Sequence, residues 1–162
     1  MNIRPSTSTD LAALINLDRA CLFAAHWTEQ QYRQVLHLQP GDPQRFAVVV
    51  DDLHLAPADA SGGASREISG FLVALHLAPE WELENIVVAP TARRIGLGTR
   101  LIHALLAKAR ETNSESVFLE VRESNAAARS LYEKAGFALT GRRKSYYTNP
   151  PEDAVLYRLS LS

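Results

Sequence analysis

Glu120 is a carboxylate within a run of otherwise apolar residues at positions 117–121. If this run is a strand, alternation places Glu120 on the face opposite Leu119 and Val121. We expect such a carboxylate to be partly buried, which would raise its pKa and suit it to accept a proton near neutral pH. A glutamate that faces solvent from an edge strand is the alternative.

Asn125 and Tyr132 follow this run and are seven positions apart, which is nearly two turns of a helix. A helix would therefore present both side chains on one side. There, an amide and a phenol near a helix N-terminus could contact a polar ligand. A tyrosine that packs in the core with only its hydroxyl at the rim is the alternative.

Residues 94–99 form a glycine-bearing turn, with Gly96 and Gly98, between a predicted strand and a predicted helix. Glycine lets a backbone approach a ligand, and the first N–H groups of a helix favour a phosphate. The dinucleotide fingerprint does not fit, because Leu101 stands where it requires a third glycine, and the Gly-Lys-Ser/Thr triplet of a P-loop is absent. A tight turn without a ligand is the alternative.

The chain has 162 residues, of which 46% are hydrophobic and 22% charged. This predicts one globular domain over residues 1–162 and excludes the collagen-like, coiled-coil and disordered classes. One cysteine, Cys21, excludes an internal disulfide and a cysteine-rich zinc site. Cys21 is also far from the motifs in sequence, so we do not expect it to be a nucleophile. The five histidines lack metal-ligand spacing, so no metal site is predicted.

The formal net charge is −1, but residues 1–80 carry 5 basic against 9 acidic side chains and residues 81–162 carry 12 against 9. A mildly basic second half could serve an anionic ligand; chance distribution of surface charge is the alternative. Without a basic stripe, nucleic-acid binding is not expected. With no apolar run near ~20 residues and no signal-peptide pattern, we expect no membrane association and a cytoplasmic protein.

Helical spacing predicts a first helix that starts near Thr9–Asp10 and carries Leu22 on its apolar side. A second helix should start at Thr28, which forms a capping box with Gln31, and end at Pro40–Gly41.

Three strands are predicted next at residues 46–50, 68–77 and 81–88, as an antiparallel meander with a flexible loop at 56–66.

The second half predicts a helix after the glycine turn, a strand at 117–121, and a helix capped by Ser124 and ended by Gly136. Two final strands are expected at 137–141 and 154–161, split by a polar loop. The order ααβββαβαββ predicts an α/β domain of the mixed-sheet, α+β kind: a mostly antiparallel central sheet with helices on both faces.

Several of these motifs, in this order, resemble the GNAT acetyltransferase superfamily, and most closely its RimI type, the ribosomal-protein-alanine N-acetyltransferases. The similarity spans about residues 84–158. The matching residues are Pro90, Arg94, Gly96, Gly98, Leu119, Glu120, Val121, Arg122, Ser124, Asn125, Ala128, Leu131, Tyr132, Gly136, Phe137, Arg142, Arg143, Tyr146, Tyr147, Glu152, Asp153 and Ala154. The resemblance implies a GNAT-like fold.

The resemblance also implies an acetyl-CoA site and no metal. Its cofactor-binding residues would be Ile86, Val87, Val88, Arg94, Ile95, Gly96, Leu97, Gly98, Thr99 and Asn125. Glu120 would be the general base and Tyr132 the general acid. Glu84 could accept the ammonium group of the acceptor, and it is a rival base.

The implied acceptor is the N-terminus of a protein, most directly a ribosomal protein with N-terminal Ala, bound between Trp27 and the pair Tyr146 and Tyr147. Two departures from the RimI-type pattern concern this acceptor region: His26 replaces the proline before Trp27, and the loop at 56–66 is longer. The alternatives are an acetyltransferase of a small amine (a polyamine, an amino acid or an antibiotic) and a catalytically silent acyl-CoA-binding module. We expect a monomer or a weak dimer.

Overall fold

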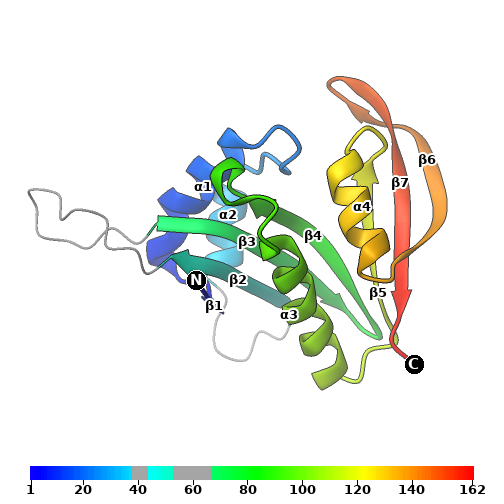
Figure 1. The fold of residues 1–162 in the computed structure, drawn as a ribbon, viewed down its shortest axis with the longest axis horizontal. Coiled ribbons are helices and arrows are strands. Elements are labelled where there is room, and N and C mark those ends of the chain that lie inside the picture. The colour runs from blue at the N-terminus through cyan, green and yellow to red at the C-terminus, as the bar shows by residue number, and fades with distance from the viewer. Residues whose placement is uncertain (38–43, 53–66) are drawn as a thin grey trace, which may run out of the picture.

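The computed structural model describes residues 1–37, 44–52 and 67–162. These residues form a seven-stranded sheet in the order β1-β2-β3-β4-β5-β7-β6, with four α-helices and two short 3-10 helices (Figure 1). The elements are β1 Asn2–Pro5, η1 Ser8–Asp10, α1 Leu11–Ala20, α2 Glu29–Leu36, β2 Arg45–Asp52, β3 Glu67–Leu77, β4 Glu80–Val88, η2 Pro90–Ala92, α3 Leu97–Glu111, β5 Ser116–Arg122, α4 Ala126–Lys134, β6 Ala138–Thr148 and β7 Pro151–Ser160.

Helices cover both faces of this sheet, and each face has its own core. On one face, Leu14 of α1 and Tyr32 of α2 pack against Phe71 of β3. On the other face, Leu101 and Leu105 of α3 belong to a larger core that continues beneath α4. The mixed sheet, the antiparallel meander of β2, β3 and β4, and the helices on both faces confirm the fold predicted from the sequence.

The sheet opens between β4 and β5, its one parallel pair among the described strands. The two strands pair only from Glu80 with Ser116 to Glu82 with Phe118. Beyond Glu82 they diverge, and Figure 1 shows the two arms of the sheet separating from that end. The last six residues of β4 therefore present an edge that β5 does not cover.

β4 also contains a register shift within this open stretch. Asn85 pairs with Val73 and Leu83 pairs with Ala74, so the pairing passes over Glu84. Such a bulge reverses the face to which the following side chains point. Leu83 accordingly packs in the core beside α3, whereas Val87 packs in the core beside α1 and α2.

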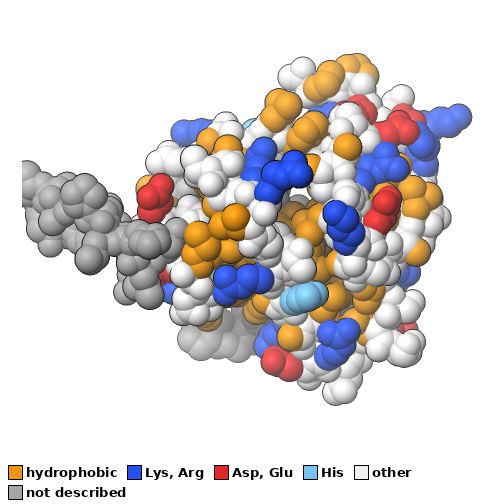
Figure 2. All heavy atoms as spheres, viewed as in Figure 1, with side chains coloured by type: hydrophobic (Ala, Val, Ile, Leu, Met, Phe, Trp, Pro, Cys, Tyr) orange, Lys and Arg blue, Asp and Glu red, His pale blue; other side chains and the backbone are white. Residues whose placement is uncertain are grey.

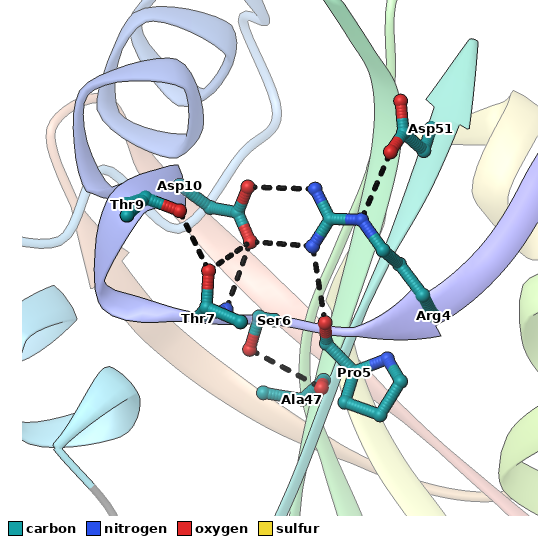
Figure 3. Close-up of polar contacts among 8 residues, drawn as sticks. All are labelled: Arg4, Pro5, Ser6, Thr7, Thr9, Asp10, Ala47 and Asp51. Atoms are coloured by element: carbon teal, nitrogen blue, oxygen red, sulfur yellow. Dashed lines mark hydrogen bonds and ion pairs between the residues drawn. The ribbon is translucent and has the colours of Figure 1, made fainter. Parts of the chain in front are cut away.

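β1 is an edge strand that the sequence does not reveal, because it is four residues long and ends in a proline. A buried ion-pair cluster joins it to the fold (Figure 3). The Arg4 guanidinium donates to both carboxylate oxygens of Asp10 at 2.8 Å and to Asp51 of β2 at 3.0 Å. Burial opposes the charged form of Asp10, but its hydrogen bonds from Arg4 and Thr7 outweigh this and lower its pKa.

Three predicted boundaries are wrong: the end of α1, the start of α4 and the loop between β6 and β7. Leu22 lies beyond the end of α1 and is 81% exposed, because Cys21 takes an extended backbone that ends the helix. The cap of α4 is Asn125 and not Ser124, whose N–H instead donates to Glu152.

The predicted polar loop after residue 141 is mostly strand, and only two residues separate β6 from β7. β6 is an edge strand exposed on both faces, so its sequence shows no alternation. The predicted helix end at Pro40–Gly41 and the loop at 56–66 lie outside the described residues. No helix in the described part of the chain is long and apolar enough to cross a membrane.

Candidate active site

Two adjoining cavities occupy the region where β4 and β5 diverge. The first, of about 810 Å³, lies between the end of β4, the start of α3 and α4. The second, of about 900 Å³, lies between the α1–α2 loop, β4, β5 and the β6–β7 hairpin. The two cavities adjoin, because six residues line both: Phe23, Ala24, Ile86, Ser124, Asn125 and Ala128.

The first cavity has basic side chains at its border. Figure 2 shows Lys and Arg side chains around a hollow with apolar walls on this face of the molecule. Arg93, Arg94 and Lys134 are among the residues that line the cavity, together with the first turn of α3. Positive side chains and free helical N–H groups at one site favour an anionic ligand.

Nine of the ten predicted cofactor-binding residues line this first cavity. They are Ile86, Val87, Val88, Arg94, Gly96, Leu97, Gly98, Thr99 and Asn125. Ile95 does not line it; its side chain is 59% exposed. The structure therefore brings the end of β4 and the glycine turn to one place, as the resemblance implies.

Gly96 and Gly98 are each required for a different structural reason. Gly96 is the N-cap of α3 and has a φ of 84°, which L side chains rarely adopt. A Cβ on Gly98 would lie 3.0 Å from the side chain of Leu131 on α4. Gly96 thus turns the chain into α3, and Gly98 allows α3 and α4 to pack closely.

Cys21 also lines the first cavity, although it is distant from the motifs in sequence. Its thiol is buried, donates to the carbonyl of Val88 at 3.7 Å and accepts from Arg93 at 3.6 Å. Cys21 is therefore close to the motifs in space, although it is far from them in sequence. No arrangement of neighbouring groups identifies it as a nucleophile.

The second cavity contains every residue predicted for catalysis or acceptor binding. Its walls include Trp27, Glu84, Glu120, Tyr132, Tyr146 and Tyr147. These side chains come from the α1–α2 loop, β4, β5, α4 and β6. The cavity therefore combines carboxylates with an aromatic lining, next to the cavity that suits an anionic ligand.

Glu120 lies on β5 with 19% of its side chain exposed, and the alternation expected for residues 117–121 is confirmed. Its carboxylate forms an ion pair with Arg143 at 2.8 Å and a hydrogen bond with the hydroxyl of Tyr146. Glu84, the rival base, is held at 3.0 and 3.2 Å by the guanidinium of Arg45. Each carboxylate thus has a cationic partner, and both line the same cavity.

Glu82 and Glu152 are two further carboxylates of this cavity that were not predicted from the sequence, and Glu82 is the one with a raised pKa. Burial, with the nearby charges of Glu84 and Glu120, raises its pKa. The signal was present in the sequence, because Glu82 and Glu84 lie two positions apart in a predicted strand. This pattern alone does not identify Glu82 as a cavity residue, because the sequence does not show where β4 and β5 separate.

Tyr132 is 5% exposed, and burial, together with neighbouring Tyr147, raises its pKa. Its phenol therefore holds its proton over a wide pH range and can act as a donor. The Asn125 side chain accepts the N–H of Ala128 at 3.2 Å, so this amide caps α4 as well as lining both cavities. The structure brings Asn125 and Tyr132 to the same cavity.

Tyr146 and Tyr147 both line the second cavity. This is unexpected for consecutive residues, because neighbours in a regular strand point to opposite faces. A register shift between Arg143 and Tyr147 makes this possible, and Ser145 within it has a φ of 53°. Asp153 of β7 accepts the N–H of Ser145 at 2.8 Å. The two rings lie edge to face, 5.1 Å apart.

Within the described residues, no group of three or more His, Cys, Asp or Glu side chains could hold a metal ion. The arrangement instead supports transfer of a group between a ligand in the first cavity and an acceptor in the second. Carboxylates can take a proton from the acceptor, and a protonated phenol can give one to a leaving group.

The model of the acetyltransferase (GNAT) family matches residues 11–137. The ribosomal protein bS18-alanine N-acetyltransferase of Escherichia coli is 32% identical over 149 residues, which cover 91% of this chain and 96% of that protein. The crystal structure of the ribosomal-protein-S18-alanine N-acetyltransferase from Escherichia coli has a TM-score of 0.79 and 27% identity, with 99% of this chain and 94% of that chain covered.

A crystal structure of Arabidopsis thaliana NAA60 in complex with acetyl-CoA has a TM-score of 0.84 and covers 99% of this chain and 98% of that chain. Its identity of 18% means that it supports the fold alone.

Proposed function

This chain belongs to the acetyltransferase (GNAT) family, and we propose that it transfers the acetyl group of acetyl-CoA to the α-amine of a protein N-terminus. The proposed acceptor is a ribosomal protein with N-terminal Ala, because the 32% identical relative bears that activity in its name. The observation that carries the proposal is that two different cavities adjoin and share six lining residues, one cavity basic at its border and the other lined with carboxylates and aromatic rings.

Acetyl-CoA is assigned to the first cavity. The free N–H groups at the start of α3, with Arg94, face the place for the pyrophosphate. The open edge of β4 at Ile86, Val87 and Val88 offers backbone hydrogen bonds to the pantetheine arm, since β5 does not pair there. The thioester then reaches the residues that both cavities share.

The reaction needs no covalent enzyme intermediate. Glu120 takes a proton from the acceptor ammonium group, directly or through a water molecule, and Glu84 is the rival base. The neutral amine attacks the thioester carbonyl, and backbone N–H groups at the end of β4 stabilise the negative charge on its oxygen. As the carbon–sulfur bond breaks, Tyr132 donates its proton to the thiolate of CoA, and the nitrogen of the new amide gives up its extra proton, directly or through water, to the Tyr132 phenolate. Holding both substrates in line supplies a large part of the rate.

The acceptor is assigned to the second cavity, between Trp27 on one wall and Tyr146 and Tyr147 on the other. Aromatic walls provide a large contact area at a small entropic cost, which favours an extended peptide over a small amine. The test is release of the CoA thiol from acetyl-CoA with a panel of peptides, combined with mass spectrometry of protein N-termini from cells with and without the enzyme. Absence of turnover with every peptide, despite binding of CoA, would contradict the proposal.

One observation favours a second candidate, acetylation of a small polyamine. The second cavity is lined by four carboxylates, and such a group of charges attracts a multiply charged amine; they are Glu82, Glu84, Glu120 and Glu152. Three of the four are paired with the guanidinium groups of Arg45, Arg143 and Arg122, which reduces this attraction. Faster turnover of a polyamine than of any peptide would establish this second candidate in place of the first.

A further inference from the structure

A buried carboxylate holds the α1–α2 loop, residues 21–28, which forms one wall of the second cavity. Asp18 of α1 is 1% exposed. Its Oδ1 accepts the backbone N–H of His26 at 3.0 Å and lies 3.1 Å from Nδ1 of the His26 ring. Its Oδ2 accepts the hydroxyl of Tyr32, whose pKa is raised by burial and by this carboxylate, so that the hydroxyl remains a donor.

The same network reaches the open part of β4. Asn85, which is 5% exposed, directly follows Glu84, where the register shifts. Its Nδ2 donates to the Tyr32 hydroxyl at 3.1 Å, and its Oδ1 accepts the N–H of Ala25 at 3.4 Å. Two consecutive N–H groups of the loop are therefore bound by buried side chains, one on α1 and the other on β4.

The backbone of His26 is unusual and depends on these contacts. Its φ is 52°, in the left-handed region that non-glycine residues rarely adopt. The next residue, Trp27, has its ring 5.4 Å from that of Tyr32. A proline could not replace His26 in this conformation, because its ring fixes φ near −65° and it has no N–H to donate. The loop path therefore differs from the one that a proline before Trp27 would impose.

We propose that Asp18 is a positioning residue for the acceptor, which holds His26 in its left-handed turn and so fixes Trp27 as a wall of the second cavity. The hydrogen bonds to this carboxylate are charge-assisted and shielded from water, which makes them strong and makes the unpaired charge costly. The proposal rests on the proposed function only in assigning the acceptor to the second cavity. The first cavity, where acetyl-CoA is assigned, should be unaffected.

The kinetic test compares Asp18→Asn and Tyr32→Phe with the unmodified enzyme. Asp18→Asn cannot accept from both donors, because one of its two terminal atoms is an amide nitrogen. Loss of a hydrogen bond to a charged group predicts a KM for the acceptor peptide about tenfold higher, with the KM for acetyl-CoA unchanged. Tyr32→Phe should also raise the KM for the acceptor peptide.

A matched control separates positioning from general stability. Thr112 accepts the Trp81 indole N–H at 3.0 Å in a polar network at the opposite end of β4. Thr112→Val should lower the melting temperature and leave both KM values unchanged. If Asp18→Asn also leaves the acceptor KM unchanged, or raises both KM values equally, the proposal is wrong.

A second pair of variants tests the backbone of His26 directly. His26→Gly keeps the N–H and the positive φ and removes only the ring, whereas His26→Pro removes both backbone features. We expect His26→Pro to raise the acceptor KM at least about tenfold and His26→Gly to change it far less. Equal effects of the two substitutions would overturn the role of the backbone.

Acrylamide quenching of tryptophan fluorescence gives a readout that needs no activity. The chain has two tryptophans, and Trp81 is 1% exposed, so quenching reports mainly on Trp27. We expect His26→Pro and Asp18→Asn to increase quenching and His26→Gly to resemble the unmodified enzyme. If no peptide is acetylated, the proposed function fails, and quenching alone decides whether Asp18 positions Trp27; unchanged quenching overturns that role.

Discussion

The carboxylate of Glu120 lies 2.8 Å from the guanidinium of Arg143, so an ion pair spans from β5 to β6 across the intervening strand β7. The hydroxyl of Tyr146 bonds to the same carboxylate. The proposed base is thus attached to the hairpin that forms one wall of the acceptor cavity. Binding of the acceptor and removal of its proton are therefore expected to depend on the same few residues.

Glu120→Gln keeps the shape and hydrogen bonding of the side chain but cannot accept a proton. Because general-base catalysis contributes about 10²–10⁴-fold, kcat/KM should fall by that order near pH 7. The loss should shrink as the pH rises past the pKa of the acceptor α-amine, about 7.7–8.0, since the free amine then needs no base. A pH–rate profile of both enzymes measures this.

Glu84→Gln is the matched variant, because Glu84 lines the same cavity and also has a cationic partner. We expect it to raise the acceptor KM more than it lowers kcat. A harmless Glu120→Gln together with a severe loss in Glu84→Gln would identify Glu84 as the base.

Tyr132→Phe should lower kcat and leave the affinity for acetyl-CoA nearly unchanged, because only the proton donor is lost. Burial raises the pKa of Tyr132 above its ordinary value of 10.0, so its acid form persists beyond that pH. The kcat profile of the unmodified enzyme should therefore show no alkaline loss below about pH 10 from this group. An effect of Tyr132→Phe on the acceptor KM alone would make Tyr132 a binding residue.

The elements predicted most accurately from the sequence are those with regular apolar spacing and clear ends. The α3 pattern, the apolar strand around Glu120 and the left-handed Gly136 at the end of α4 are found where expected. β1 was missed because none of its four residues is buried, and its attachment through Arg4 is a long-range contact. No local pattern encodes such a contact.

The site residues were predictable in kind, whereas their geometry was not. Spacing placed Glu120 on the correct face of its strand. The register shift at Glu84 and the one before Tyr147 could not be anticipated, because a bulge depends on how two strands pair. The first shift directs Asn85 toward Tyr32, and the second directs Tyr146 toward Glu120.

Gly96→Ala should destabilise the protein by about 1–2 kcal/mol, because an L-residue is strained in the left-handed region. It should also weaken acetyl-CoA binding, since the turn orients the first N–H groups of α3. Gly141→Ala is the control: a Cβ there would meet no atom within 4 Å. Calorimetry with acetyl-CoA and thermal unfolding measure both effects. Unchanged affinity in Gly96→Ala would contradict the phosphate assignment.

Asp10→Asn should lower stability at neutral pH by about 1–3 kcal/mol, because Asp10 accepts charge-assisted hydrogen bonds from Arg4. The pKa of Asp10 is lowered below its ordinary 3.8, so its contribution is complete above that pH and is lost as the pH falls through the folded-state pKa. The difference in stability between Asp10→Asn and the unmodified protein should therefore become smaller only in strong acid.

Thermal unfolding over a pH series measures this difference. Glu29→Gln removes an exposed pair with Arg33 and should have little effect at any pH. If the two variants behave alike, the Arg4 cluster does not anchor β1 as its geometry indicates.

The acceptor itself provides the sharpest test of the second cavity. We expect a short peptide that begins Ala-Arg to be acetylated faster than the same peptide with a blocked α-amine and an added lysine, and faster than a free polyamine. Trp27 and Tyr146 offer contact area to an extended chain, and the amine of a small first residue can approach the thioester without obstruction. The ratio of kcat/KM should be at least about tenfold, or about 1.4 kcal/mol of transition-state discrimination. An equal or better rate with the lysine side chain or the polyamine would exclude N-terminal specificity. It would leave the proposed assignment of acetyl-CoA to the first cavity intact, because that assignment depends on different residues.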